Sequence, residues 1–208
     1  MSGEKLIQEL FDASWQEVAS RTDSLTGKSI EIDLPAAPQI LLPSEPQQHL
    51  PVLSHLDEAA SIARSCGFET LVQKFDAARP HLRWTQNEAY VRDNPDNPFL
   101  SAYAFATVSG ASGPLICDVP LCGFILIGPD VHYPAHHHAP SEVYLLMGPG
   151  IRWQLDHGDW FGTSAGDLIF HDSWRVHATL TANAPMLAFV SWLDKSERDG
   201  IRWAHPPA

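Results

Sequence analysis

The chain has 208 residues, of which 44% are hydrophobic and 18% are charged, so it is long enough to bury a core in one domain with an elaboration. Its formal net charge is -12 at pH 7 and it holds no run of five basic residues, which argues against a nucleic acid or an anionic membrane surface as its partner. No run of 18 apolar residues occurs, so the sequence predicts no membrane span.

The three cysteines predict neither a disulfide framework nor a zinc knuckle. Cys66, Cys117 and Cys122 are odd in number and lack C-x-x-C spacing. The N-terminal stretch MSGEKLIQEL carries acidic residues and no apolar run, unlike a signal peptide. We therefore expect a protein of a reducing compartment, most simply the cytoplasm.

The first part of the chain has a helical pattern. In EKLIQELFDASWQEVASRT, apolar side chains recur near helical spacing with polar residues between them, at Leu6, Leu10, Trp15 and Val18. The stretch LPAAPQILLPSEPQQHLP follows, and its prolines exclude a regular helix. We expect it to run over the surface.

A helical pattern returns over SHLDEAASIARSCG, with Ser54 as the expected N-cap and Gly67 as the expected end. A further short helix is expected over residues 69–78, before Pro80. Residues 1–98 are therefore predicted to form a helical and proline-rich extension.

From about Phe99 the pattern changes to short apolar or alternating runs, such as AYAFATVS, CGFILIG and MLAFVSWL, with Gly, Pro, Asp and Asn between them. Many brief strands separated by turn residues are typical of an antiparallel sandwich or barrel. We expect a mainly β protein, with a barrel in residues 99–208 against which the extension packs. His157, in LDHGDW, falls at an expected hairpin turn.

The segment YPAHHHAPSEVY gathers metal-binding side chains. Side chains two apart in a strand share a face, so His136 and His138 point the same way. Pro140 marks a turn, after which Glu142 and Tyr144 again share a face. These four groups converge if the hairpin folds back on itself. Imidazole and carboxylate ligands suit Zn, Fe, Mn, Ni and Co, so we expect one divalent metal ion of unspecified identity.

A third imidazole is expected from GDLIFHDSWRVHATLT. His177 lies in an alternating stretch, whereas His171 falls at an expected turn in HDSW, so His177 is the favoured ligand. His171 is expected to be an ordinary packed or hydrogen-bonded histidine, as are His132 and His205.

These residues resemble the two motifs of the cupin superfamily. HHHAPSE contains HxHx3E, which resembles the first motif, and Gly166 and His177 match the second at the usual separation. Asp172, Trp174 and Thr181 depart from that second motif. The resemblance implies a single cupin barrel (a double-stranded β-helix, or jelly-roll) that carries an N-terminal α-helical extension.

A sharper resemblance rests on two tyrosines. Tyr133 precedes the histidines and Tyr144 follows Glu142 by two, and a cupin with this pattern is similar to the dimethylsulfoniopropionate (DMSP) lyases of marine bacteria, the Q type in particular. The resemblance implies a set of metal ligands: His138, Glu142, Tyr144 and His177. It leaves His136 open as a metal ligand or a substrate contact.

DMSP cleavage to dimethyl sulfide and acrylate is a β-elimination, in which a base removes the proton next to the carboxylate. A divalent metal stabilises the charge that develops, and its proximity lowers the pKa of a phenol. Tyr144 is therefore the implied base, and Tyr133 is implied to hold the substrate. The sulfonium cation suits an aromatic wall, for which Trp160, Trp174 and Trp192 are candidates.

Three other interpretations stay open. An Fe or Mn cupin dioxygenase or isomerase, acting on a small carboxylate, thiol or diketone, would use the same ligands, and a non-catalytic cupin would bind a small carboxylate. Tyr144 is also compatible with an ordinary barrel-core tyrosine whose hydroxyl bonds the backbone. The expected partners are a small zwitterionic substrate and, for a chain with apolar strands, a second copy in a homodimer, but no nucleic acid or membrane.

Overall fold

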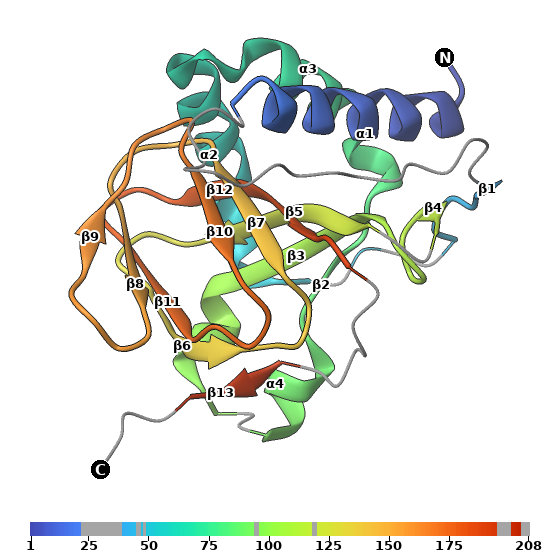
Figure 1. The fold of residues 1–208 in the computed structure, drawn as a ribbon. Helices are drawn as coiled ribbons and strands as arrows, with labels where there is room; N and C mark the ends of the chain where they lie inside the picture. Colours follow the sequence, from blue (N-terminus) through green and yellow to red (C-terminus); the bar gives the residue numbers. More distant parts are fainter. Residues whose placement is uncertain are drawn as a thin grey trace.

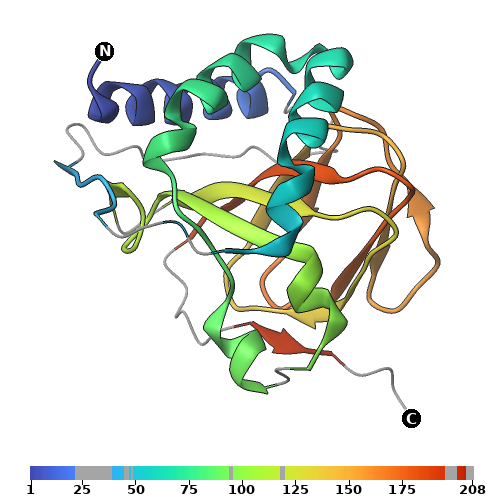
Figure 2. The same cartoon turned by 180° about the vertical axis from the view of Figure 1, so that it is seen from behind.

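The structure of the chain is a computed structural model that describes residues 1–21, 39–44, 47, 49–93, 96–117, 120–194 and 201–204. A layer of helices covers one side of a pair of β-sheets, as both views show (Figures 1 and 2). Among these residues, no helix is long and apolar enough to cross a bilayer. His205 and residues 34–38, 45, 46 and 48 of the proline-rich stretch lie outside the described residues.

Helix α1 (Gly3–Ala19) confirms the first predicted helix. The Ser2 side chain caps its N-terminus by accepting a hydrogen bond from the Lys5 amide. One face of the helix is buried: Ile7, Leu10, Phe11, Ser14, Trp15 and Val18. The Trp15 ring meets Phe189 of the large sheet edge-on, with the ring centroids 5.3 Å apart, so the helix packs directly on that sheet.

Helices α2 (Leu56–Ala63) and α3 (Glu69–Ala78) confirm the two further helices that the sequence predicts. A π-helical turn over Arg64–Phe68 joins them, and Gly67 adopts φ 93° inside it. A positive φ is readily available only to glycine, so Gly67 interrupts the helix as expected and redirects the chain into α3 at once.

The predicted N-cap of α2 is wrong. Ser54 lies inside a 3₁₀ turn that leads straight into the helix, and its hydroxyl donates to the Pro51 carbonyl at 2.9 Å. Pro51 opens that turn, because its fixed φ suits a first helical position. The shorter helical elements are η2 (Pro51–His55), η4 (Arg79–His81), α4 (Glu88–Asp93) and η5 (Pro98–Ala102).

The larger sheet has eight strands in the order β1-β4-β3-β5-β12-β7-β10, with β2 paired to β3. Its strands are β1 (Gln39–Ile40), β2 (Trp84–Thr85), β3 (Tyr103–Ser109), β4 (Leu115–Ile116), β5 (Leu121–Ile127), β7 (Glu142–Leu146), β10 (Leu168–His171) and β12 (Met186–Trp192). β1 and β2 precede residue 99 and still pair with strands of this sheet. The division of the chain into an extension and a barrel at residue 99 therefore stays a prediction.

The smaller sheet has five strands in the order β13-β6-β11-β8-β9. Its strands are β6 (His132–His137), β8 (Ile151–Leu155), β9 (Phe161–Gly162), β11 (His177–Thr181) and β13 (Arg202–Trp203). The predicted turn at His157 is confirmed, since Asp156 and His157 both adopt a positive φ between β8 and β9.

From β5 to β12 the chain alternates between the two sheets, except that β8 and β9 form a hairpin within the smaller one, and this path produces the double-stranded β-helix of a jelly-roll. The predicted cupin barrel with an N-terminal helical extension is therefore confirmed. The unbroken apolar run LCGFILI forms β5, and it needs no polar alternation because the strand is buried on both faces. Phe124 and Leu126 pack with the helices, whereas Ile125 and Ile127 face the barrel interior.

β5 lies in tight contact with β3 at Gly123. A Cβ at this position would overlap the Ala106 carbonyl oxygen and lie 2.9 Å from Cζ of Phe105. Gly123→Ala is therefore expected to lower the free energy of unfolding by about 1–3 kcal/mol, as overpacking does. Gly162→Ala is the control, since a Cβ at this exposed position meets nothing within 4 Å. Urea unfolding of both variants tests this, and equal stabilities would contradict the tight contact.

Candidate metal centre

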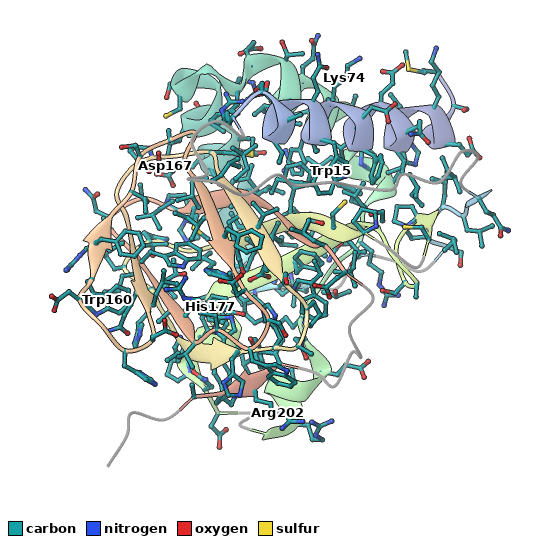
Figure 3. The ribbon with its side chains drawn as sticks, viewed as in Figure 1. Trp15, Lys74, Trp160, Asp167, His177 and Arg202 are labelled. Atoms are coloured by element: carbon teal, nitrogen blue, oxygen red, sulfur yellow. The ribbon has the colours of Figure 1, made fainter. Side chains whose placement is uncertain are left out.

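The register of the strands brings five site residues to one end of the barrel. In the smaller sheet His136 of β6 lies opposite His177 of β11. In the larger sheet Glu142 of β7 lies between His171 of β10 and Trp192 of β12. His177 lies between the sheets at the end that β6 and β13 close (Figure 3). Strand pairing alone thus assembles groups that lie up to 56 positions apart, from His136 to Trp192.

These groups form two overlapping sets of candidate metal ligands. His136, His138 and His177 make up one, and Glu142, His171 and His177 the other, and the ligand atoms of each set lie within 4.8 Å of one another. All five side chains are at most 3% exposed. The structure therefore brings together four of the groups that the sequence analysis expects to meet, His136, His138, Glu142 and His177. Tyr144, the further group expected there, lines the adjoining cavity together with His136, His138 and Glu142.

Three of the rings are fixed by the main chain. Each directs Nδ1 at a carbonyl oxygen two residues away, at 2.9 Å: His136 at Pro134, His138 at Pro140 and His177 at Arg175. Because a carbonyl oxygen only accepts, each Nδ1 carries a proton. Nε2 is then the atom that each ring turns toward the centre, which is the arrangement that metal-binding histidines adopt.

The residues present fit a divalent metal ion. Nε2 of His138 lies 3.1 Å from Oε2 of Glu142, and Nε2 of His177 lies 3.4 Å from the same oxygen. Within the part of the chain that the structure describes, this buried His177 nitrogen has no hydrogen-bond partner. A buried polar atom left in this state costs about 1–3 kcal/mol, which coordination to an ion would offset. Imidazole and carboxylate donors accept Zn, Fe, Mn, Ni and Co.

Electrostatics prepares these groups as ligands. Burial alone would raise the pKa of the Glu142 carboxyl, but the adjacent His138, His171 and His177 hold that pKa well below its usual range. Burial, with His177 and His138 nearby, holds the pKa of His136 well below its usual range. Glu142 is therefore ionised and His136 neutral, the protonation states that metal binding requires.

His171 was misplaced by the sequence analysis. It is the last residue of β10 rather than part of a turn, and it is fully buried. Its Nδ1 lies 3.0 Å from Oε2 of Glu142, and its Nε2 accepts a hydrogen bond from Nε1 of Trp153 at 2.9 Å. Extending the alternation of GDLIFH by one residue would have placed His171 on the same face as Ile169, toward the barrel interior.

A cavity of about 310 Å³ adjoins the candidate metal ligands. All four tyrosines of the chain line it, namely Tyr90, Tyr103, Tyr133 and Tyr144. Sequence reasoning identified Tyr133 and Tyr144 but missed Tyr90, which comes from α4, outside the barrel, and places its hydroxyl 2.7 Å from that of Tyr133. Burial, and then the charge of Glu142, raises the pKa of Tyr144 well above its usual value.

Of the three candidate tryptophans, the structure places only Trp192 in the cavity lining. Its indole Nε1 donates to Oε1 of Glu142 at 2.9 Å. Trp174 is 43% exposed and lies under the Arg202 guanidinium, whose carbon is 5.2 Å from the ring centroid. Trp160 lies by His132, with their ring centroids 5.8 Å apart. Trp174 has φ 62°, the left-handed region that favours the glycine of the second cupin motif.

Comparison with known proteins places the chain in a family. The family model for dimethylsulfoniopropionate lyases matches residues 36–188, about three quarters of the chain. The chain belongs to the dimethylsulfoniopropionate lyase family. It is 27% identical over 94 residues to the dimethylsulfoniopropionate lyase DddQ of Ruegeria pomeroyi, a match that covers 45% of this chain and 47% of that protein.

A second family relative is the putative dimethylsulfoniopropionate lyase DddL of Cereibacter sphaeroides, 23% identical over 154 residues, which are 74% of this chain and 63% of that protein. The chain thus aligns with about half to two thirds of the length of these curated relatives.

Two solved structures share the fold. The crystal structure of DddQ from Ruegeria pomeroyi superposes with a TM-score of 0.74 at 22% identity, covering 99% of each chain. A chain from the crystal structures of the DMSP lyases RdDddP and RnDddQII superposes with a TM-score of 0.73 at 23% identity, covering 98% of this chain and 100% of that one. These structural matches extend the shared fold to the helical N-terminal part.

The centre is expected to hold about one divalent ion per chain, as single-metal protein sites do. After loading with Zn²⁺ and removal of free ion, His138→Ala should lose most of the bound metal because it lacks one converging Nε2. His132→Ala is the control, since His132 is exposed and belongs to neither candidate ligand set. Mass spectrometry of the metal content gives the result, and equal zinc in both variants would contradict the assignment.

Metal affinity is expected to rise with pH. Burial would lower the pKa of His138, but the Glu142 carboxylate outweighs burial and raises that pKa above its usual value. A proton on Nε2 therefore competes with the ion until the pH exceeds the raised pKa, so binding weakens below it by up to about tenfold per pH unit. Zn²⁺ titrations at about pH 6 and pH 8 test this. An unchanged dissociation constant would be the contrary result.

Proposed function

We propose that the chain cleaves DMSP by β-elimination into dimethyl sulfide and acrylate, with one divalent ion held by His138, Glu142, Tyr144 and His177, and with His136 beside them as a further ligand or a substrate contact. The observation that carries this proposal is the convergence of three imidazole nitrogens and an ionised carboxylate beside a cavity lined by four tyrosines. Membership of the DMSP lyase family supports the choice of substrate.

The cavity suits a small zwitterion. Its volume of about 310 Å³ is at the lower end for ligand pockets, which fits a substrate of few heavy atoms. The metal-binding groups lie at one wall and would face the carboxylate of the substrate. The sulfonium end has no hydrogen-bond donors, and aromatic faces stabilise such a cation by about 0.5–2 kcal/mol per contact.

Tyr144 is the proposed base. A bound divalent ion supplies a Lewis acid for the substrate carboxylate and lowers the pKa of the nearby phenol. The Tyr144 oxygen then takes the proton from the carbon next to the carboxylate, the electron pair forms the C=C bond, and the C–S bond breaks to release dimethyl sulfide. Trp153 and His171 hold the ring, with centroid distances of 4.9 Å and 5.7 Å.

Tyr133 is proposed to orient the substrate. Its ring stacks on His136 with centroids 4.1 Å apart and on Phe99 at 4.2 Å. Its hydroxyl is fixed by that of Tyr90. A phenol held on both sides in this way presents a rigid wall next to the metal-binding groups, which lowers the entropic cost of positioning the substrate.

The direct test of this function is headspace detection of dimethyl sulfide from purified protein and DMSP. Release is expected from the metal-loaded protein without oxygen, and it should stop after chelation and return on addition of the ion. Oxygen consumption with a thiol or diketone, without sulfide release, would instead identify a dioxygenase of the same fold.

Tyr144→Phe is expected to lower kcat for dimethyl sulfide release by about 10²–10⁴-fold, the usual contribution of a general base. The ring and its packing are retained, so the zinc content and the unfolding temperature should remain near those of the wild type. Gas chromatography of the headspace gives the rate. A variant that keeps wild-type activity would refute the role of Tyr144 as the base.

A further inference from the structure

We infer that His171 is a positioning residue that holds the Glu142 carboxylate toward the ion and does not bind the ion itself. The inference rests on the proposed metal site. It assigns a role to each ring nitrogen of His171, which the β-elimination mechanism uses only to hold the Tyr144 ring. Proximity alone does not distinguish a metal ligand from a positioning residue here, because His171 belongs to one of the candidate ligand sets.

The contact with Trp153 decides the state of the His171 ring. The indole Nε1–H of Trp153 lies 2.9 Å from Nε2 of His171. An indole N–H can only donate, so this Nε2 must accept, and the proton of the neutral imidazole lies on Nδ1. A nitrogen that carries a proton has no lone pair with which to bind a metal.

The protonated Nδ1 has a partner in reach. It lies 3.0 Å from Oε2 of Glu142, a good distance for an N–H donor to a carboxylate oxygen. Trp153, His171 and Glu142 therefore form a chain of two hydrogen bonds in which every polar atom of His171 is used. The Nε2 atoms of His138 and His177 instead point at the same carboxylate oxygen from the side of the proposed ion.

The environment makes this arrangement rigid. Trp153 and His171 are both fully buried, and the His171 ring stacks on that of His177 with centroids 3.8 Å apart and planes at 15°. The other oxygen of Glu142 accepts from Trp192 at 2.9 Å. Each carboxylate oxygen thus has its own N–H donor, which prevents rotation of the group and fixes the direction of its remaining lone pairs.

Three variants separate positioning from ligation. His171→Asn places an amide Nδ2 where Nδ1 lies and keeps a donor to Glu142, whereas His171→Leu fills the site without one. Trp153→Phe keeps an aromatic ring but removes the donor to His171. In Co²⁺ titrations, His171→Leu should bind about 10- to 100-fold more weakly than the wild type, the usual loss for a group that orients a ligand, and His171→Asn should bind within a few-fold of it.

A spectroscopic readout distinguishes the inference from a merely structural role and remains available if His171→Leu does not fold. In the Zn²⁺-loaded wild type, ¹⁵N NMR should show His171 as the neutral tautomer with its proton on Nδ1, and Trp153→Phe should weaken that preference. A metal-bound nitrogen on His171, or a proton on its Nε2, would overturn the inference. So would wild-type affinity in His171→Leu.

Neither measurement uses DMSP, so the two proposals fail separately. Normal cobalt binding that weakens in His171→Leu, together with no dimethyl sulfide release, would refute the lyase function and support the role of His171. Absence of cobalt binding by the wild type would refute the metal site and, with it, this inference.

Discussion

An ionised carboxylate buried at the end of the barrel is the constraint on which the rest of the site depends. Glu142 is 3% exposed, and an unpaired charge at such a depth would be prohibitively unfavourable. Imidazole and indole nitrogens surround it from four strands or strand ends: His138, His171, His177 and Trp192. The same contacts that make burial of the charge tolerable also define where a cation would be bound.

The two faces of the larger sheet have different roles. One face packs against α1, α2 and α3 through residues such as Phe124 and Phe189. The other face carries Glu142 and Tyr144 on β7, the strand between β12 and β10. The N-terminal part does more than cover the barrel, because Tyr90 from α4 completes the cavity wall and bonds Tyr133.

The spacing of apolar and polar residues along the sequence predicted the helices, the strands and the faces of the strands. It identified α1, α3 and the barrel strands, and HxHx3E indicated that His136, His138 and Glu142 converge, since two-residue alternation fixes the face of a strand. The boundary of α2 was missed because Pro51 starts a 3₁₀ turn before the expected cap.

What could not be predicted arises from tertiary contacts. Tyr90 has no motif around it and reaches the cavity only because α4 packs across the barrel end. Trp174 and Trp192 are equally aromatic in sequence, yet the positive φ of Trp174 directs it to the surface and β12 delivers Trp192 to Glu142. His171 looked like a turn residue, because the pairing of β10 with β7 that buries it is set by partners elsewhere in the chain.

Anomalous X-ray diffraction from crystals of the Zn²⁺-loaded protein tests the central claim most directly. The account predicts one strong peak between the sheets, about 2.0–2.2 Å from Nε2 of His138, Nε2 of His177 and an oxygen of Glu142, with His171 outside bonding distance. A barrel end without a peak, or a peak bound to His171 in place of these atoms, would contradict it.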